Sequence, residues 1–261
     1  MSYLLAYRLN AKLAFRVWQR ELTLYKRIWP STILSTLFDP ILYLLAMGFG
    51  VGAYITQTIE GVSYLQFIAP GLVASSVMYA AAYEAAWNSY VRIYHERSYD
   101  AMMTTPAELE DVVGGEVAWG ATRACIYSIV MLGVLAAFGL VRSPWALLVP
   151  VVAFLGGAMF MVLGLAYTVR VKHMDQLTFL FTLGVTPMFL FSGVFFPLAG
   201  LPAWVQVVAW VSPLYHLVEI VRALALGAID VALAGHAAWM LVAVVALWGL
   251  PVSVLRRKLR S

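Results

Sequence analysis

The sequence contains six apolar runs of roughly twenty residues, and these runs restrict the fold more than any other feature. A helix of that length, rising about 1.5 Å per residue, crosses a hydrocarbon core of about 30 Å. Because 63% of the residues are hydrophobic and only 11% are charged, a soluble domain is excluded. The chain is predicted to be one all-α polytopic membrane domain, 1–261, with six transmembrane helices. The predicted spans are residues 31–54, 66–87, 117–140, 145–169, 177–197 and 236–255.

The distribution of Lys and Arg predicts the orientation of these spans. Fourteen of the seventeen basic residues lie before residue 31, in 88–116, in 170–176 or in the carboxyl tail. These segments alternate with connections that carry few basic residues. Positive loops stay on the cytoplasmic side of a membrane. Both termini and the 88–116 segment are therefore predicted to be cytoplasmic.

Residues 5–29 form an amphipathic pattern before the first span. Arg8, Lys12, Arg16 and Arg20 follow one another at i,i+4 spacing, and apolar residues recur at helical spacing on nearly the opposite side. This pattern is typical of a basic helix that lies in the interface of an anionic leaflet. A second apolar flank leaves open the alternative that one side packs against protein.

The 88–116 segment is the longest polar interruption in the front two-thirds of the chain, and it holds six of the thirteen acidic residues. Residues 98–103 are predicted to form a short helix that ends at a Thr-Thr-Pro turn. Thr105-Pro106-Ala107-Glu108 has the pattern of a capping box that opens the next helix. The segment is either an ordinary capped loop or a structured element on which a soluble partner pushes.

The 198–235 segment is apolar, but proline divides it into two pieces, 203–210 and 214–226. Each is too short to cross a bilayer alone, which predicts two short re-entrant helices at the outer face, within 203–226. His216, Glu219 and Arg222 share one side of the second helix. They either satisfy one another or line a polar exit.

Three ionisable residues lie inside the predicted spans. Asp39 precedes Pro40 near the middle of the first span, where it either caps the helix that the proline restarts or belongs to a transport pathway. Glu84 and Arg123 lie at the same predicted depth in the second and third spans, so we predict an ion pair between them. The pair is either a static lock or a moving gate.

No catalytic chemistry is indicated. The sequence has no GxxxxGK[ST] phosphate-binding loop, no histidine cluster with ligand spacing and a single cysteine, Cys125. We therefore predict no catalytic, cofactor or metal residues, and no nucleic-acid partner. Two further classes are less favoured alternatives, a stand-alone channel and a membrane-embedded lipid-modifying enzyme. The spans are too apolar for the first, and helix capping already accounts for the clustered acids that the second would need.

Four segments resemble the type 2 ATP-binding cassette (ABC) exporter permeases, and the resemblance covers essentially the whole chain. They are Ala69–Leu72 (APGL), Tyr99–Pro106 (YDAMMTTP), Gly114–Glu116 (GGE) and Thr186–Leu198 (TPMFLFSGVFFPL). The likeness is greatest to the NodJ-like branch, whose members are permeases of nodulation-factor (lipo-oligosaccharide) exporters.

The resemblance implies a permease subunit in the bacterial inner membrane, surrounded by membrane lipids. Two such permeases form a homodimer that binds two cytosolic ABC ATPase subunits (NodI-like). ATP and Mg²⁺ would then bind the partner ATPase rather than this chain. The implied cargo is a lipid-linked or amphiphilic glycan, and a drug or antibiotic efflux permease is the alternative.

The resemblance also implies roles for particular residues. It identifies 95–103 as a coupling helix between spans two and three. The ATPase-coupling candidates are His95, Tyr99, Asp100, Met103, Thr105 and Pro106. The pathway or gate candidates are Phe38, Asp39, Tyr43, Glu84, Arg123, Phe189 and Phe195.

Overall fold

The structure, a computed structural model, describes residues 9–55 and 58–259, except for the side chains of 33–37, 39 and 259. Every named element in this part of the chain is a helix, which confirms the all-α prediction. Five of the described helices are long and apolar enough to cross a membrane, or up to six with a bent pair. The five are Tyr64–His95, Leu109–Ala137, Pro144–Thr168, Met174–Phe191 and Ala232–Lys258.

These five helices match the predicted second to sixth spans, with shifted ends. The first comprises α2 (Tyr64–Tyr83) and two following π-helical turns; the second is α4 (Leu109–Ala137). The third contains α5 (Val149–Thr168); the fourth contains α6 (Leu177–Phe179) and α7 (Thr186–Phe191). The fifth joins α10 (Ala232–Leu247) to α11 (Gly249–Leu259). The predicted fifth span is too long at its end, because Gly193 adopts a left-handed backbone (φ +75°) soon after α7.

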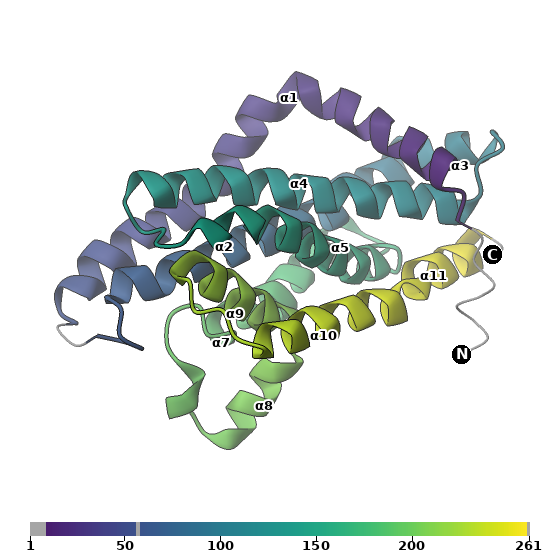
Figure 1. Ribbon diagram of the computed structural model, residues 1–261. Coiled ribbons are helices and arrows are strands. Elements are labelled where there is room, and N and C mark those ends of the chain that lie inside the picture. The colour runs from purple at the N-terminus through teal and green to yellow at the C-terminus, as the bar shows by residue number, and fades with distance from the viewer. Residues whose placement is uncertain (1–8, 56–57, 260–261) are drawn as a thin grey trace.

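The amino-terminal region corrects the sequence-based prediction. The interfacial helix at 5–29 and the first span at 31–54 are joined in one helix, α1 (Ala11–Leu45), with Pro30 and Pro40 inside it. Proline bends a helix without always ending it, and Figure 1 shows α1 arching away from the bundle. The Ser31 and Thr32 hydroxyls both donate to the Ile28 carbonyl beside the first proline, which favours the bend. The apolar remainder, Pro40–Ala53, is shorter than a span.

The first half of α1 packs against α4 at close range. A Cβ atom built on Gly115 would lie 2.5 Å from Val17 Cβ and 2.6 Å from the Ala14 carbonyl oxygen. The Trp18 indole also donates a hydrogen bond of 2.9 Å to the Thr122 hydroxyl. This side of the helix therefore packs on protein, as the alternative interpretation required. An interfacial location for the exposed basic side stays a prediction.

The 88–116 segment is more helical than the sequence indicated. The second membrane helix continues to His95, Arg97 turns the chain with a left-handed backbone (φ 50°), and α3 occupies Ser98–Met103. The predicted short helix at 98–103 is thus confirmed. The predicted capping box at 105–108 is wrong, because α4 begins at Leu109.

Two hydrogen bonds explain this shift of the cap. The Thr105 hydroxyl donates to the Met102 carbonyl at 2.6 Å, so it closes α3 instead of opening α4. The Asp111 carboxylate accepts from the Glu108 backbone N–H at 3.1 Å, and the real capping box joins these two residues.

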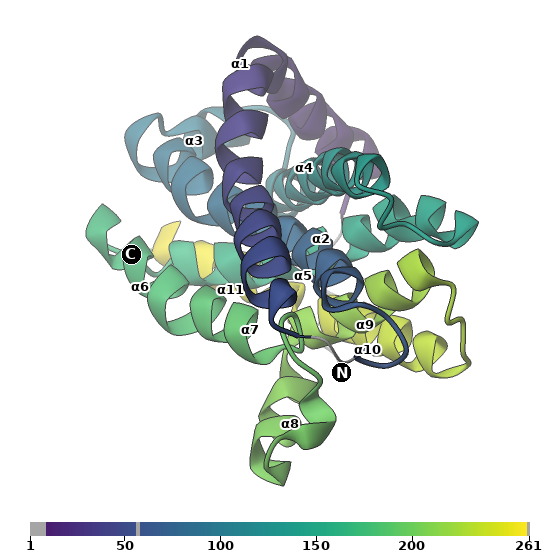
Figure 2. The same cartoon turned by 90° about the vertical axis from the view of Figure 1, so that its left-hand side faces the viewer.

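The bundle has α2 at its centre, packed against α1, α4, α5 and α9. Two short helices occupy the predicted region, α8 (Ala203–Val211) and α9 (Pro213–Leu226), and they meet at 87°. That they are re-entrant at the outer face stays a prediction. Figure 2 shows α8 projecting away from the bundle, whereas α9 lies within it.

One end of the bundle, which we call the α3 end, gathers α3, the start of α1 and the end of α11 (Figure 1). Two contacts hold it together: Arg256 pairs with Glu110, and the Asn10 N–H donates to Asp111 at 2.6 Å. The described starts and ends of the chain therefore share one side. That this side is cytoplasmic stays a prediction.

Candidate functional site

The predicted ion pair between Glu84 and Arg123 is confirmed, and both side chains are buried. The Asn88 amide also donates to the Glu84 carboxylate at 2.6 Å, and Arg123 donates to the Tyr127 hydroxyl at 3.2 Å. Glu84 and Arg123 are 39 residues apart along the chain, so their contact joins two different spans at this site.

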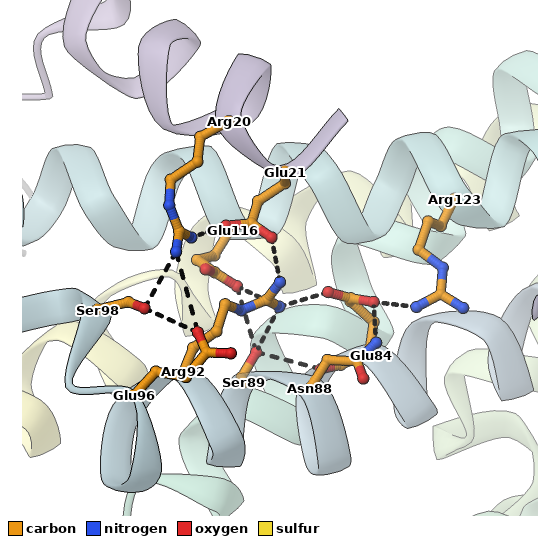
Figure 3. Close-up of polar contacts among 10 residues, drawn as sticks. All are labelled: Arg20, Glu21, Glu84, Asn88, Ser89, Arg92, Glu96, Ser98, Glu116 and Arg123. Carbon is orange, nitrogen blue, oxygen red and sulfur yellow. Dashed lines mark hydrogen bonds and ion pairs between the residues drawn. The ribbon is translucent and has the colours of Figure 1, made fainter. Parts of the chain in front are cut away.

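The structure adds a residue that the sequence analysis missed, Arg92, at the centre of the same site (Figure 3). Its guanidinium pairs with Glu21 from α1, with Glu84 from the second membrane helix, and with Glu116 from α4 at 2.8 Å. We call the cluster of Glu21, Glu84, Arg92, Glu116 and Arg123 the charge network. It joins three helices through buried charges.

The charge network was not predicted, for two reasons. Arg92 and Glu116 fall in a segment interpreted as a loop, and Glu21 in a helix interpreted as interfacial. One signal was available: Glu84, Asn88, Arg92 and Glu96 follow one another at i,i+4 spacing, which marks one polar face of a continuous helix.

The charge network has more carboxylates than buried guanidinium groups. Glu21, Glu84 and Glu116 are buried, as are Arg92 and Arg123. Glu21 has an additional partner in Arg20, which is partly exposed. A buried charge is costly unless it is paired. These carboxylates therefore depend on the guanidinium of Arg92, to which all three are paired.

The charge network is tied to α3. Arg20 donates to the Ser98 hydroxyl at 3.1 Å and lies 3.9 Å from Glu96. Tyr99 is buried, and burial raises the pKa of its hydroxyl well above the ordinary value, so the side chain is neutral. The short helix therefore rests on the network by one of its sides.

The six predicted coupling residues divide by exposure. Tyr99 and Met103 both belong to α3. Tyr99 is buried and Met103 is half-buried against the core, so these two face inward. The other four are available at the surface. They are His95, Asp100, Thr105 and Pro106.

The predicted pathway residues do not form one group. The Tyr43 ring lies 5.3 Å from that of Phe189 and 6.0 Å from that of Phe195, so these three are together. Phe38 is exposed, and the side chain of Asp39 lies outside the described residues. Glu84 and Arg123 belong to the charge network instead.

The aromatic group borders a cavity of about 330 Å³ between α1, α2 and the helix that contains α7. Three tyrosines and two phenylalanines are among its lining residues, a combination that suits sugar rings as well as acyl chains. The lining residues are Pro40, Tyr43, Leu72, Ser75, Tyr79, Tyr83, Phe181, Thr186 and Phe189.

The predicted outer trio is only partly together. Arg222 pairs with Glu219 at 2.9 Å and donates to the Gly193 carbonyl at 2.6 Å. His216 does not join them, which corrects the prediction. Its ring nitrogens contact His236 Nδ1 at 2.8 Å and the Trp210 carbonyl at 2.7 Å, because the ring faces α10.

Comparison with known proteins gives consistent matches over most of the chain. The profile of the ABC-2 type transporter family matches residues 13–226. Nodulation protein J of Rhizobium leguminosarum bv. trifolii is 34% identical over 246 residues, which covers 93% of this chain and 92% of that protein. Nodulation protein J of Rhizobium meliloti (strain 1021) is 33% identical over 246 residues, with 93% and 92% covered. The inner membrane transport permease YadH of Escherichia coli (strain K12) is 26% identical over 241 residues, with 92% and 93% covered.

Proposed function

The chain belongs to the ABC-2 type transporter family, and from this membership and the site we propose that it is the permease subunit of an ATP-driven exporter. Its cargo is a lipid-linked or amphiphilic glycan that leaves the cytoplasm. The resemblance to permeases of nodulation-factor exporters supports this cargo class, and so does the cavity of tyrosine and phenylalanine rings.

The observation that carries the proposal is the connection from α3 through the charge network to three long helices. Ser98 contacts Arg20, which pairs with Glu21, and Glu21 pairs with Arg92. Separating these groups would leave a charge buried without a partner, which is strongly unfavourable. A push on α3 is therefore passed to α1, to α4 and to the second membrane helix together.

The push comes from a separate cytosolic ABC ATPase, which binds ATP and Mg²⁺. Two copies of the permease act with two ATPase subunits, and ATP-driven closure of the ATPases presses on the exposed side of each α3. Asp100 lies on that side and is the residue we assign to direct contact with the ATPase.

The spans tilt in response and open a route between the first and fifth spans of opposite subunits. Within one chain, Tyr43 lies on the first of these elements and Phe189 on the fifth span, and both border the aromatic cavity. In this proposal their rings stack on the sugars while the acyl part stays in lipid.

Co-expression and co-purification with a candidate cytosolic ABC ATPase from the same genome test the proposal. Asp100→Lys reverses the charge on the exposed side of α3, so we expect loss of ATPase association and of ATP-dependent glycolipid transport. Asp230→Lys is the matched control, since Asp230 is an exposed aspartate away from α3. Unchanged association and transport in Asp100→Lys would refute the coupling role. ATP hydrolysis by the purified chain alone would refute the need for a partner.

A further inference from the structure

A groove of about 460 Å³, lined by both charged and apolar side chains, lies between α1, the second membrane helix and α4. This size lies within the range of small-molecule sites. The groove lies beside the charge network and is distinct from the aromatic cavity. Its lining residues are Glu21, Leu24, Tyr25, Arg27, Ile28, Thr32, Glu84, Asn88, Val91, Arg92, Glu96, Trp119 and Arg123.

Polar groups are incompletely used in the deep wall as well as at the rim of the groove. The buried Tyr25 hydroxyl, Arg92 Nε and Arg123 Nε have no hydrogen-bond partner among the described residues. Arg27 is exposed and makes no hydrogen bond or ion pair with another residue in the described ranges. Asn88 uses its amide nitrogen on Glu84, which leaves its oxygen as an acceptor. The Glu96 side chain is 51% exposed. Its Oε2 lies 3.9 Å from Arg20 and accepts from the Ser98 hydroxyl at 2.9 Å, which leaves Oε1 as an acceptor. The rim therefore offers one cationic donor and two acceptors.

The charges of the lining balance. Three guanidinium groups face three carboxylates, so the groove carries no net formal charge. Such a lining favours a ligand with both signs of charge over a simple anion. Planar guanidinium groups hydrogen-bond phosphate well, and carboxylates accept from ammonium groups.

Apolar residues of α1 extend from the same groove. Leu24 and Ile28 line it and are 44% and 56% exposed, and Trp29 beside them is 52% exposed. A ligand whose polar head occupies the groove would have its hydrocarbon tail against this apolar strip. The site thus has the two parts that an amphiphile requires.

We propose that this groove binds the phosphoethanolamine headgroup of a membrane phospholipid. The phosphate is held by Arg27, and the ammonium group donates to Glu96 and to the Asn88 oxygen. The acyl chains lie along Leu24 and Ile28. Bound there, the lipid fills the space under the arch and stabilises α1 against the charge network.

The test compares thermal unfolding of the purified chain in micelles with added phosphatidylethanolamine, phosphatidylcholine or phosphatidylglycerol of the same acyl chains. Phosphatidylcholine is the matched lipid, because it is equally zwitterionic but has no N–H donor. We expect phosphatidylethanolamine to raise the unfolding temperature most, since ligand binding to the folded state stabilises it. Its apparent affinity should exceed that of phosphatidylcholine by about tenfold.

Two variants locate the site. Arg27→Ala and Glu96→Gln should each lower the apparent affinity for phosphatidylethanolamine by about tenfold. Lys26→Ala, which removes an adjacent exposed cation outside the groove, should leave it unchanged.

Three outcomes would overturn the proposal. Equal stabilisation by phosphatidylcholine would remove the ammonium contact, and stronger stabilisation by phosphatidylglycerol would make the site anionic. Equal effects of the Arg27 and Lys26 variants would place binding elsewhere. Because no ATPase or transport is needed, failure here leaves the proposed permease function untouched.

Discussion

Two arginines at different places in the bundle are equally buried but have different partners. Arg92 and Arg222 are both 7% exposed. Arg92 pairs with three carboxylates, whereas Arg222 pairs with one carboxylate and donates to the carbonyls of Phe67 and Gly193. The Arg222 guanidinium also lies 4.0 Å above the Phe67 ring.

The different partners of Arg92 and Arg222 show which parts of the chain each arginine holds together. Around Arg92 the partners are side chains on three helices, so the contacts fix the helices relative to one another. Around Arg222 the shortest hydrogen bond is to the Gly193 carbonyl, in the bend after α7, so Arg222 holds this connection in place. The α3 end is therefore suited to transmit a movement, and the Arg222 cluster is suited to keep a loop in place.

The largest effect should come from replacing the two arginines themselves. Arg92→Met leaves three buried carboxylates without their shared cation, so we expect a loss of about 3–5 kcal/mol in the free energy of unfolding. Arg222→Met leaves one carboxylate and two backbone carbonyls without their partner. Because only one of these groups is charged, we expect a smaller loss of about 2 kcal/mol. Denaturation by sodium dodecyl sulfate in mixed micelles measures the free energy of unfolding of both variants.

Arg97→Met is the control, since Arg97 is exposed in the turn before α3, and its denaturation curve should match the wild type. If Arg222→Met proved as damaging as Arg92→Met, the proposed distinction between a shared cation and a loop anchor would be wrong.

The next prediction separates carboxylates within the charge network. Glu84 pairs with Arg92 and Arg123 and accepts from Asn88, whereas Glu116 has one cationic partner and an oxygen without a hydrogen bond in the described structure. Glu84→Gln should therefore cost about 2–3 kcal/mol, and Glu116→Gln about 1 kcal/mol or less. The same denaturation assay applies. Equal losses would show that total charge, and not the pattern of pairs, decides stability.

A third prediction compares glycines at close contacts. A Cβ on Gly115 would meet Val17 at 2.5 Å and a backbone oxygen at 2.6 Å, whereas on Gly71 it would meet Val194 at 3.1 Å. Gly115→Ala must push α1 away from α4 and should cost about 1–3 kcal/mol. Gly71→Ala requires a smaller shift and should cost about 1 kcal/mol or less. A greater loss from Gly71→Ala would show that α1 yields more easily than its contacts indicate.

Much of the fold followed from local patterns. Apolar runs long enough to cross a membrane predicted the second to sixth spans, and the proline pair at 202 and 213 predicted two short outer helices. The Glu84–Arg123 pair followed from equal depth in adjacent spans. Each of these depends on length, sequence spacing or charge placed within an apolar run, which a sequence displays directly.

The rest depended on contacts that local patterns do not display. The pattern predicts a helix over 5–29 and a separate span over 31–54, but α1 packs on α4 and continues through Pro30 between them. Arg92 was counted as a topology signal, because its carboxylate partners lie 71 and 24 residues away along the chain as well as on its own helix. His216 was grouped with Glu219 by spacing, although its partner His236 lies on another helix.

That histidine pair gives the smallest effect and tests a hydrogen-bond direction. His216 Nε2 lies 2.7 Å from the Trp210 carbonyl, so it must be the donor there. The neutral ring then accepts at Nδ1, and His236 donates through its own Nδ1–H at 2.8 Å. His236→Phe removes this donor and should cost about 1 kcal/mol in the free energy of unfolding. His236→Asn should recover part of the loss, because the asparagine amide nitrogen occupies nearly the position of imidazole Nδ1. If the asparagine variant were no more stable than the phenylalanine variant, His236 would contribute ring packing against α9 and not the donated hydrogen bond.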